Sequence, residues 1–150
     1  MAKFKFRLAT LLRLREETRD QRRAELAEAY HADDLLQQHI QEADDALAEL
    51  LAQCRKVAGP GVVDIDRLVA AGRYELTLRA QRKEMVEQRE RVLAEIERRR
   101  QALVEANREV RVLEKLRENQ TRRHRDEQNR QEVKRLDEVA GRTKVTEEVS

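Results

Sequence analysis

Apolar residues recur in alternating steps of four and three along the first part of the chain. A heptad spacing sustained over this length is typical of a coiled coil rather than of an ordinary surface helix. The pattern therefore predicts a helix over about residues 5–57. Its regular positions, called the first seam, are Leu8, Leu12, Arg15, Arg19, Arg22, Leu26, Ala29, Asp33, Leu36, Ile40, Ala43, Leu47, Leu50, Cys54 and Val57.

The first seam stops at the segment AGPGVV, residues 58–63, where two glycines flank the single proline of the chain. Proline removes a backbone donor, and glycine permits turn conformations. We therefore expect a turn over residues 58–63 and a second helix from about residue 64. Either Asp64 or Asp66 can cap that helix, because a short carboxylate accepts hydrogen bonds from the amide groups of a first helical turn.

The second helix repeats the four-three spacing but carries more charged residues on it. A short break between two long periodic segments favours antiparallel neighbours. With Val57 opposite Asp66, paired residue numbers sum to about 123, which places Phe4 and Phe6 beside residues near 117–119. The positions of this second seam are Leu68, Ala71, Glu75, Leu78, Arg82, Met85, Arg89, Val92, Ile96, Arg99, Leu103, Ala106, Val110 and Leu113.

The segment RENQTRRHRDEQNRQE, residues 117–132, has no aliphatic or aromatic side chain, although it follows a continuous helical pattern. The first helix ends opposite this segment, so a helix that continues here has no partner within its own chain. Three apolar residues spaced three and four apart predict that the helix continues to about residue 141: Val133, Leu136 and Ala140. The remaining residues, 142–150, are expected to form a disordered tail.

Composition agrees with these elements, because 41% of the residues are charged and only 3% are aromatic. Long helices and coiled coils have this composition. The predicted fold is all-α and comprises one domain, residues 1–150. It is a long antiparallel two-helix coiled coil with a protruding C-terminal helix end.

Charge is distributed unevenly, although the formal net charge is only +2. Residues 24–54 carry eight acidic residues and no Lys or Arg, whereas residues 1–23 carry eight basic residues and three acidic ones. Such polarity more often marks oriented protein partners than nonspecific nucleic-acid binding. The basic run at residues 122–125 is followed by Asp126 and Glu127 and contains no aromatic residue for base stacking, so we expect a solvated or protein-contacting face.

No residue pattern indicates a catalytic, cofactor or metal site. His31 and His39 are too far apart for a helical metal-binding pair, and the single Cys54 lies on the first seam, where an inert thiol is expected. We therefore expect a non-enzymatic protein without cofactors. Charges interrupt the first apolar residues where a signal peptide needs an apolar run, and no run approaches the ~20 residues that cross a bilayer, so we expect a cytoplasmic protein.

Large side chains are rare in this chain, and several lie near the start of the second helix. Tyr74 falls outside the second seam and is therefore the better candidate for an exposed contact. Leu78 and Met85 lie on the seam, where they can equally well fill the helix pair. Gln81 lies between them.

Two end segments resemble the flagellar export protein FliJ family. FKFRLATLLRLREETRDQRRAELAEA, residues 4–29, is similar to the family's start, and REVRVLEKLRENQTRRHRDEQNRQEVKRLDEVAGR, residues 108–142, to its C-terminal arm. The resemblance implies a coiled coil similar to the central stalk of rotary ATPases. It also implies a part of the flagellar type III export apparatus, serving flagellum assembly, motility and chemotaxis.

The implied partners are the hexameric flagellar export ATPase, the cytoplasmic domain of the membrane export gate and substrate chaperones. The protein would then be peripheral to the inner face of the cell membrane, at the flagellar base. The resemblance implies export-gate contacts through Tyr74, Leu78, Gln81 and Met85. It implies ATPase contacts through Phe4, Phe6, Leu8, Leu11, Leu12, Leu113, Leu116, Arg123, Arg130, Leu136, Asp137 and Glu138.

Three other interpretations are compatible with the sequence. The nearest is the corresponding stalk protein of a virulence type III secretion system, which shares the architecture. A basic coiled-coil protein associated with nucleic acid predicts binding that falls steeply with salt. A generic dimerising coiled coil predicts a helical dimer that depends on concentration.

Overall fold

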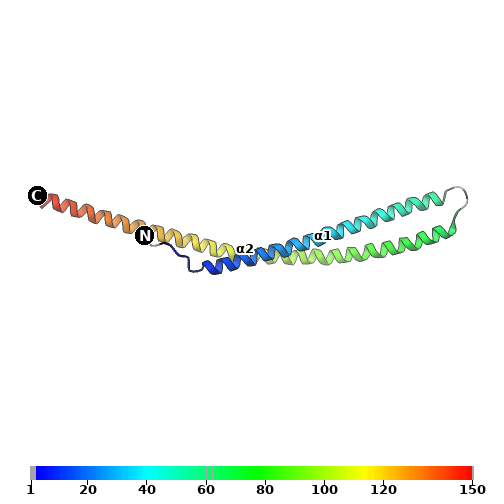
Figure 1. Ribbon diagram of the computed structural model, residues 1–150, viewed down its shortest axis with the longest axis horizontal. Coiled ribbons are helices and arrows are strands. Elements are labelled where there is room, and N and C mark those ends of the chain that lie inside the picture. The colour runs from blue at the N-terminus through cyan, green and yellow to red at the C-terminus, as the bar shows by residue number, and fades with distance from the viewer. Residues whose placement is uncertain (1–2, 60, 62, 150) are drawn as a thin grey trace. The chain divides into compact units, whose positions relative to one another are not determined.

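The computed structural model describes residues 3–59, 61 and 63–149, and its regular elements are two long α-helices (Figure 1). Helix α1 spans Ala9–Val57 and helix α2 spans Ile65–Val149. The two helices pack against each other and no described residue forms a strand, which confirms the predicted all-α, two-helix coiled coil. The chain divides into two units: unit 1 is Met1–Arg19 with Glu105–Ser150, and unit 2 is Asp20–Val104.

Asp64 is the residue that caps α2. Its Oδ1 accepts a hydrogen bond from the backbone N–H of Arg67 at 3.3 Å, and its carbonyl accepts one from Leu68 at 3.2 Å. At the end of α1, Arg55 and Lys56 occupy the last turn, where positive charge is favourable next to the helix dipole. Gly61 has φ of 142°, a conformation that side-chain-bearing residues rarely adopt. Residues 60 and 62 of the predicted turn lie outside the described residues.

The core of unit 1 forms where the two seams meet. Leu12 and Val110 are each 3% exposed and Leu113 is 8% exposed, and Phe6 and Leu8 pack against them. One turn along α1, Arg15 Nη1 lies 3.1 Å from Glu109 Oε2. The contact of Leu12 with Val110 and the ion pair of Arg15 with Glu109 each join residues whose numbers sum to about 123. This is the register expected for the antiparallel pair.

The first residues of unit 1 differ from the prediction. Residues 3–6 are not helical and α1 begins at Ala9, not near residue 5. Phe4 lies against His124, with ring centroids 5.6 Å apart, and not beside residues 117–119. The reason is geometric: non-helical backbone advances up to about 3.3 Å per residue against about 1.5 Å in a helix, so the same number of residues reaches further along α2.

Unit 2 is held together by arginines of the second seam as well as by small apolar residues. Arg89 Nε donates to Asp33 Oδ1 at 2.8 Å, and Asp33 is only 7% exposed. Arg82 forms an ion pair with Asp44, and Arg99 donates to the backbone carbonyl of Glu25. These three arginines of the second seam therefore do not interrupt the pairing, because their long side chains reach the acidic part of α1. Among the described residues of this unit, the buried apolar ones are Ala29, Ala43, Leu78 and Ile96.

The end of α2 also differs from the prediction. Instead of a disordered tail over 142–150, α2 continues through Gly141 to Val149; residue 150 lies outside the described residues. No proline follows Gly141, and the hydroxyls of Thr143 and Thr146 donate to the backbone carbonyls one turn earlier. Every residue over 125–149 is exposed, so this part of α2 is the helix end predicted to lack a partner.

Candidate partner-binding surfaces

The predicted ATPase-contacting residues separate into two groups. In the first group, Leu12 and Leu113 are buried in the core of unit 1, and Phe6 and Leu8 pack against that core. Phe4 and Leu116 are half-buried, and Leu11 is at the edge of exposure with 37% of its surface accessible. Leu12 and Leu113 stabilise the helix pair and can contact another protein only if the pair opens. Phe4, Leu11 and Leu116 keep part of their surface accessible in the packed pair.

The second group is exposed and lies late in α2. It contains Arg123, Arg130, Leu136, Asp137 and Glu138. Leu136 belongs to the four-three pattern formed with Val133 and Ala140, here called the tail stripe. Val133 and Leu136 are 56% and 63% exposed, so the tail stripe is an apolar face without a covering element among the described residues. Exposed apolar faces of this kind mark sites of protein association.

His124 is a residue whose position the sequence did not indicate. It stands within a basic run, where a solvated or protein-contacting face was expected, and its ring packs against Phe4 of the same chain. Its Nε2 is buried and has no hydrogen-bond partner. The contact therefore places Phe4 against α2 at His124, and the fully exposed part of the helix begins at the next residue.

The predicted gate-contacting residues lie on one face of α2, because their spacing is four, three and four. Tyr74 is 52% exposed and Gln81 is exposed, whereas Met85 is half-buried. Leu78 is only 7% exposed and fills the seam of unit 2. The face thus offers Tyr74 and Gln81 to a partner, while Leu78 supports the helix that carries them.

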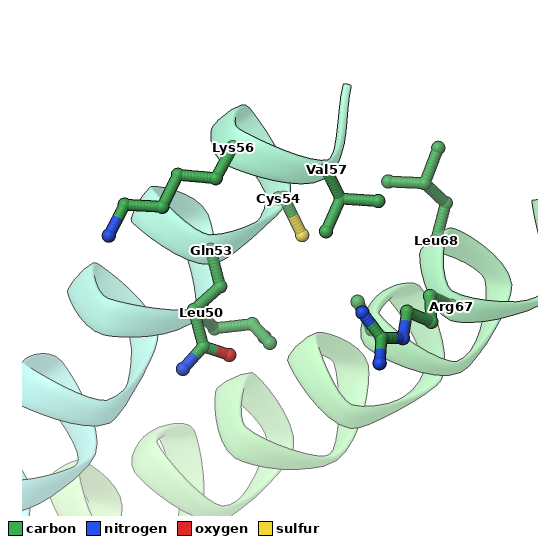
Figure 2. A pocket seen from close by; sticks show the side chains of 8 residues that line it. Leu50, Gln53, Cys54, Lys56, Val57, Arg67 and Leu68 are labelled. Atoms are coloured by element: carbon green, nitrogen blue, oxygen red, sulfur yellow. The ribbon is translucent and has the colours of Figure 1, made fainter. Parts of the chain in front are cut away.

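A groove of about 400 Å³ lies between the helices where α1 ends and α2 begins (Figure 2). In Figure 2 the sulfur of Cys54 points toward the space between the two helices. Arg67, one of the lining residues, places its Nε 3.7 Å from Oδ2 of Asp64 at the start of α2. The groove is lined by Leu50, Gln53, Cys54, Lys56, Val57, Arg67, Leu68 and Ala71.

Ion pairs in the described part of the chain lie both along the surface of α2 and between the two helices. The guanidinium groups of Arg98 and Arg99 hydrogen-bond to Glu95 and lower the pKa of its carboxyl group. Among residues 3–59, 61 and 63–149, no group of three or more His, Cys, Asp or Glu side chains is placed to hold a metal ion. Neither described helix contains a stretch apolar and long enough to span a membrane.

Comparison with known proteins bears on these surfaces. Residues 4–147 match the family model described as Flagellar FliJ protein. No curated protein and no solved structure matches the chain. The matched range includes nearly all of both helices, the tail stripe and the face that carries Tyr74.

Proposed function

Because the chain belongs to the flagellar FliJ protein family, we propose that it binds the hexameric flagellar export ATPase and connects it to the membrane export gate. Family membership makes the chain a component of the flagellar export apparatus, and the family is not catalytic. In this proposal the protein is cytoplasmic and reaches the membrane only through its partners. Substrate chaperones are further partners, and nucleic acid is not one.

The observation that carries the proposal is the exposed end of α2. Residues 125–149 are helical although none of them is buried. Most helical stability in proteins comes from packing of an apolar face rather than from intrinsic propensity. The tail stripe provides such a face, so the ATPase ring is the proposed element that covers it.

The proposed mechanism is coupling between two partners. A single helix inside a ring of six similar subunits makes unequal contacts with them, because it has no sixfold symmetry. One subunit would meet the positive charge of Arg130. Another would meet the carboxylates of Asp137 and Glu138. Such unequal contacts favour different nucleotide states in different subunits, while Tyr74 and Gln81 bind the gate.

Leu136→Gln is expected to weaken binding to the export ATPase by roughly ten- to a hundredfold, since full burial of a leucine contributes about 1.5–3 kcal/mol. The matched control is Val145→Gln. Val145 is 62% exposed against 63% for Leu136, but it lies outside the tail stripe. Binding can be measured by titrating each labelled chain with the hexamer. Equal losses in the two variants would contradict a specific contact through the tail stripe.

Tyr74→Ala is expected to reduce binding to the purified cytoplasmic domain of the export gate, with no change in the unfolding midpoint. Leu78→Ala, four residues away, is expected to lower the free energy of unfolding by about 2 kcal/mol, because Leu78 is buried. Calorimetric titration with the gate domain and thermal unfolding separate the two effects. Unchanged gate binding by Tyr74→Ala would remove this face from the proposal.

A further inference from the structure

A second apolar stripe lies near the start of α2, outside both the seam and the face that carries Tyr74. It consists of Ile65, Val69, Gly72 and Leu76, spaced four, three and four residues apart, and is called the outer stripe. Ile65 and Leu76 are each 70% exposed and Val69 is 50% exposed. Exposed large apolar side chains at regular helical spacing indicate a face that another helix covers.

Gly72 gives the outer stripe a notch at its centre. A Cβ atom built on Gly72 would meet no atom within 4 Å, so the chain itself does not require glycine at this position. Glycine inside a helix is unfavourable by roughly 0.5–1 kcal/mol relative to alanine. A reason for it outside the chain is close approach of another backbone, which a missing side chain permits.

The next positions at the same spacing are basic. The outer stripe is followed by Arg79 and Lys83, which lie with Arg82 and Asp44 along a groove of about 530 Å³ in unit 2. The groove is also lined by Glu87, so its lining carries three basic side chains against two acidic ones. Arg79 pairs with Glu75 and Arg82 pairs with Asp44. On α1, Leu51 follows Asp44 by seven residues, which places it on the same side of α1; it is 42% exposed.

We propose that the outer stripe binds an amphipathic helix of a partner protein, whose apolar residues share the four-three spacing and whose flanks are acidic. The spacing fits side-chain interdigitation between helices, the Gly72 notch admits the partner's backbone, and Arg79 and Lys83 attract its acidic flank. This surface is separate from the tail stripe, and the proposal does not depend on ATPase binding.

Two other occupants fit the surface less well. A membrane surface favours a basic apolar face of greater length, whereas the outer stripe extends over only about 17 Å and begins beside Asp64 and Asp66. A second copy of this chain would have to present an acidic apolar face from α1. The exposed large apolar residues of α1 over 24–54 do not recur at the four-three spacing: Tyr30, Leu35 and Leu51.

The test uses the full chain and two synthetic helical peptides of about 20 residues. Both peptides carry leucines at the four-three spacing, and one has glutamates on the flanks where the other has lysines. Fluorescence anisotropy is expected to show the glutamate peptide binding at least about tenfold more tightly. Val69→Gln combined with Leu76→Gln is expected to reduce that binding at least about tenfold.

Gly72→Gln fills the notch, and its Cβ meets no atom of the chain within 4 Å, so it is expected to weaken peptide binding while the helix content by circular dichroism is retained. Val104→Gln is the matched control, because Val104 is 68% exposed and lies on α2 outside the outer stripe; it should bind the glutamate peptide normally. Equal binding of the two peptides, or undiminished binding by the double variant, overturns the proposal. So does binding of the full chain to phosphatidylglycerol vesicles, or a concentration-dependent dimer, that the double variant abolishes.

Discussion

A chain that ends at Arg125 is expected to lose all stimulation of the export ATPase while both units stay folded. The truncation removes the tail stripe and the rest of the exposed helix, residues 126–149, none of which is buried. It retains the contact between Phe4 and His124 and the core around Val110. The measurement is ATP hydrolysis by the purified hexamer, titrated with the full and the shortened chain, with thermal unfolding of each chain as the folding check.

A chain that ends at Arg142 is the matched control for this truncation. It loses the last exposed residues but keeps the tail stripe, so most of the stimulation should remain. If the chain ending at Arg125 stimulated hydrolysis as well as the full chain, the ATPase would not bind the exposed end of α2. In that case the packed residues of the N-terminal segment would be the next candidates.

Val110→Asp is expected to separate the N-terminal segment from α2 and to unfold the helix pair of unit 1. Val110 is 3% exposed and packs with Leu12 and Leu113, so the new carboxylate would be buried without a partner. Such burial costs about 3 kcal/mol or more, which is a large fraction of the stability of so small a core. Urea unfolding followed by circular dichroism, and protease cleavage within residues 3–19, measure the effect.

Val112→Asp is the control for this substitution. Val112 lies two residues further along α2 and is 60% exposed, so its substitution should change the free energy of unfolding by no more than about 0.5 kcal/mol. If the two variants were destabilised to a similar extent, the assignment of Val110 to the buried seam and of Val112 to the exposed face of α2 would be wrong.

The seam positions were the most predictable part of this fold. A heptad spacing repeats over each helix, and each of its many positions supports the same register, so Leu12 and Val110 could be paired from the sequence. The pairing of Arg89 with Asp33 agrees with that register as well. The sequence did not show that Arg89 forms an ion pair across the two helices. A charged seam residue weakens the helix pair unless its side chain is long enough to reach a group of opposite charge on the other helix.

The ends of the helices were less predictable, because few contacts fix them. The start of α1 depends on a short non-helical segment that carries Phe4 to His124, a contact without a periodic signal. Gly141 suggested a helix end, but a glycine stops a helix only where the chain turns, and no turn follows here.

The candidate surfaces were predicted in part. Resemblance to the family indicated which residues to consider, and only the structure separates Leu78, which is buried, from Tyr74, which is exposed. The outer stripe was not recognised in the sequence, although Ile65, Val69 and Leu76 lie off the predicted second seam, because spacing alone does not show how much of each side chain α1 covers. Once α1 covers Leu68 and Ala71, the outer stripe is left on the surface.

The most direct test of the proposed function is site-specific photocrosslinking between this chain and the export ATPase. A photoreactive phenylalanine is placed at Leu136 in one chain and at Val104 in another, two positions with 63% and 68% exposure. If the exposed end of α2 enters the ring, Leu136 will crosslink to the ATPase and Val104 will not. Crosslinking from Val104 with none from Leu136 would show that the ATPase binds elsewhere on the chain.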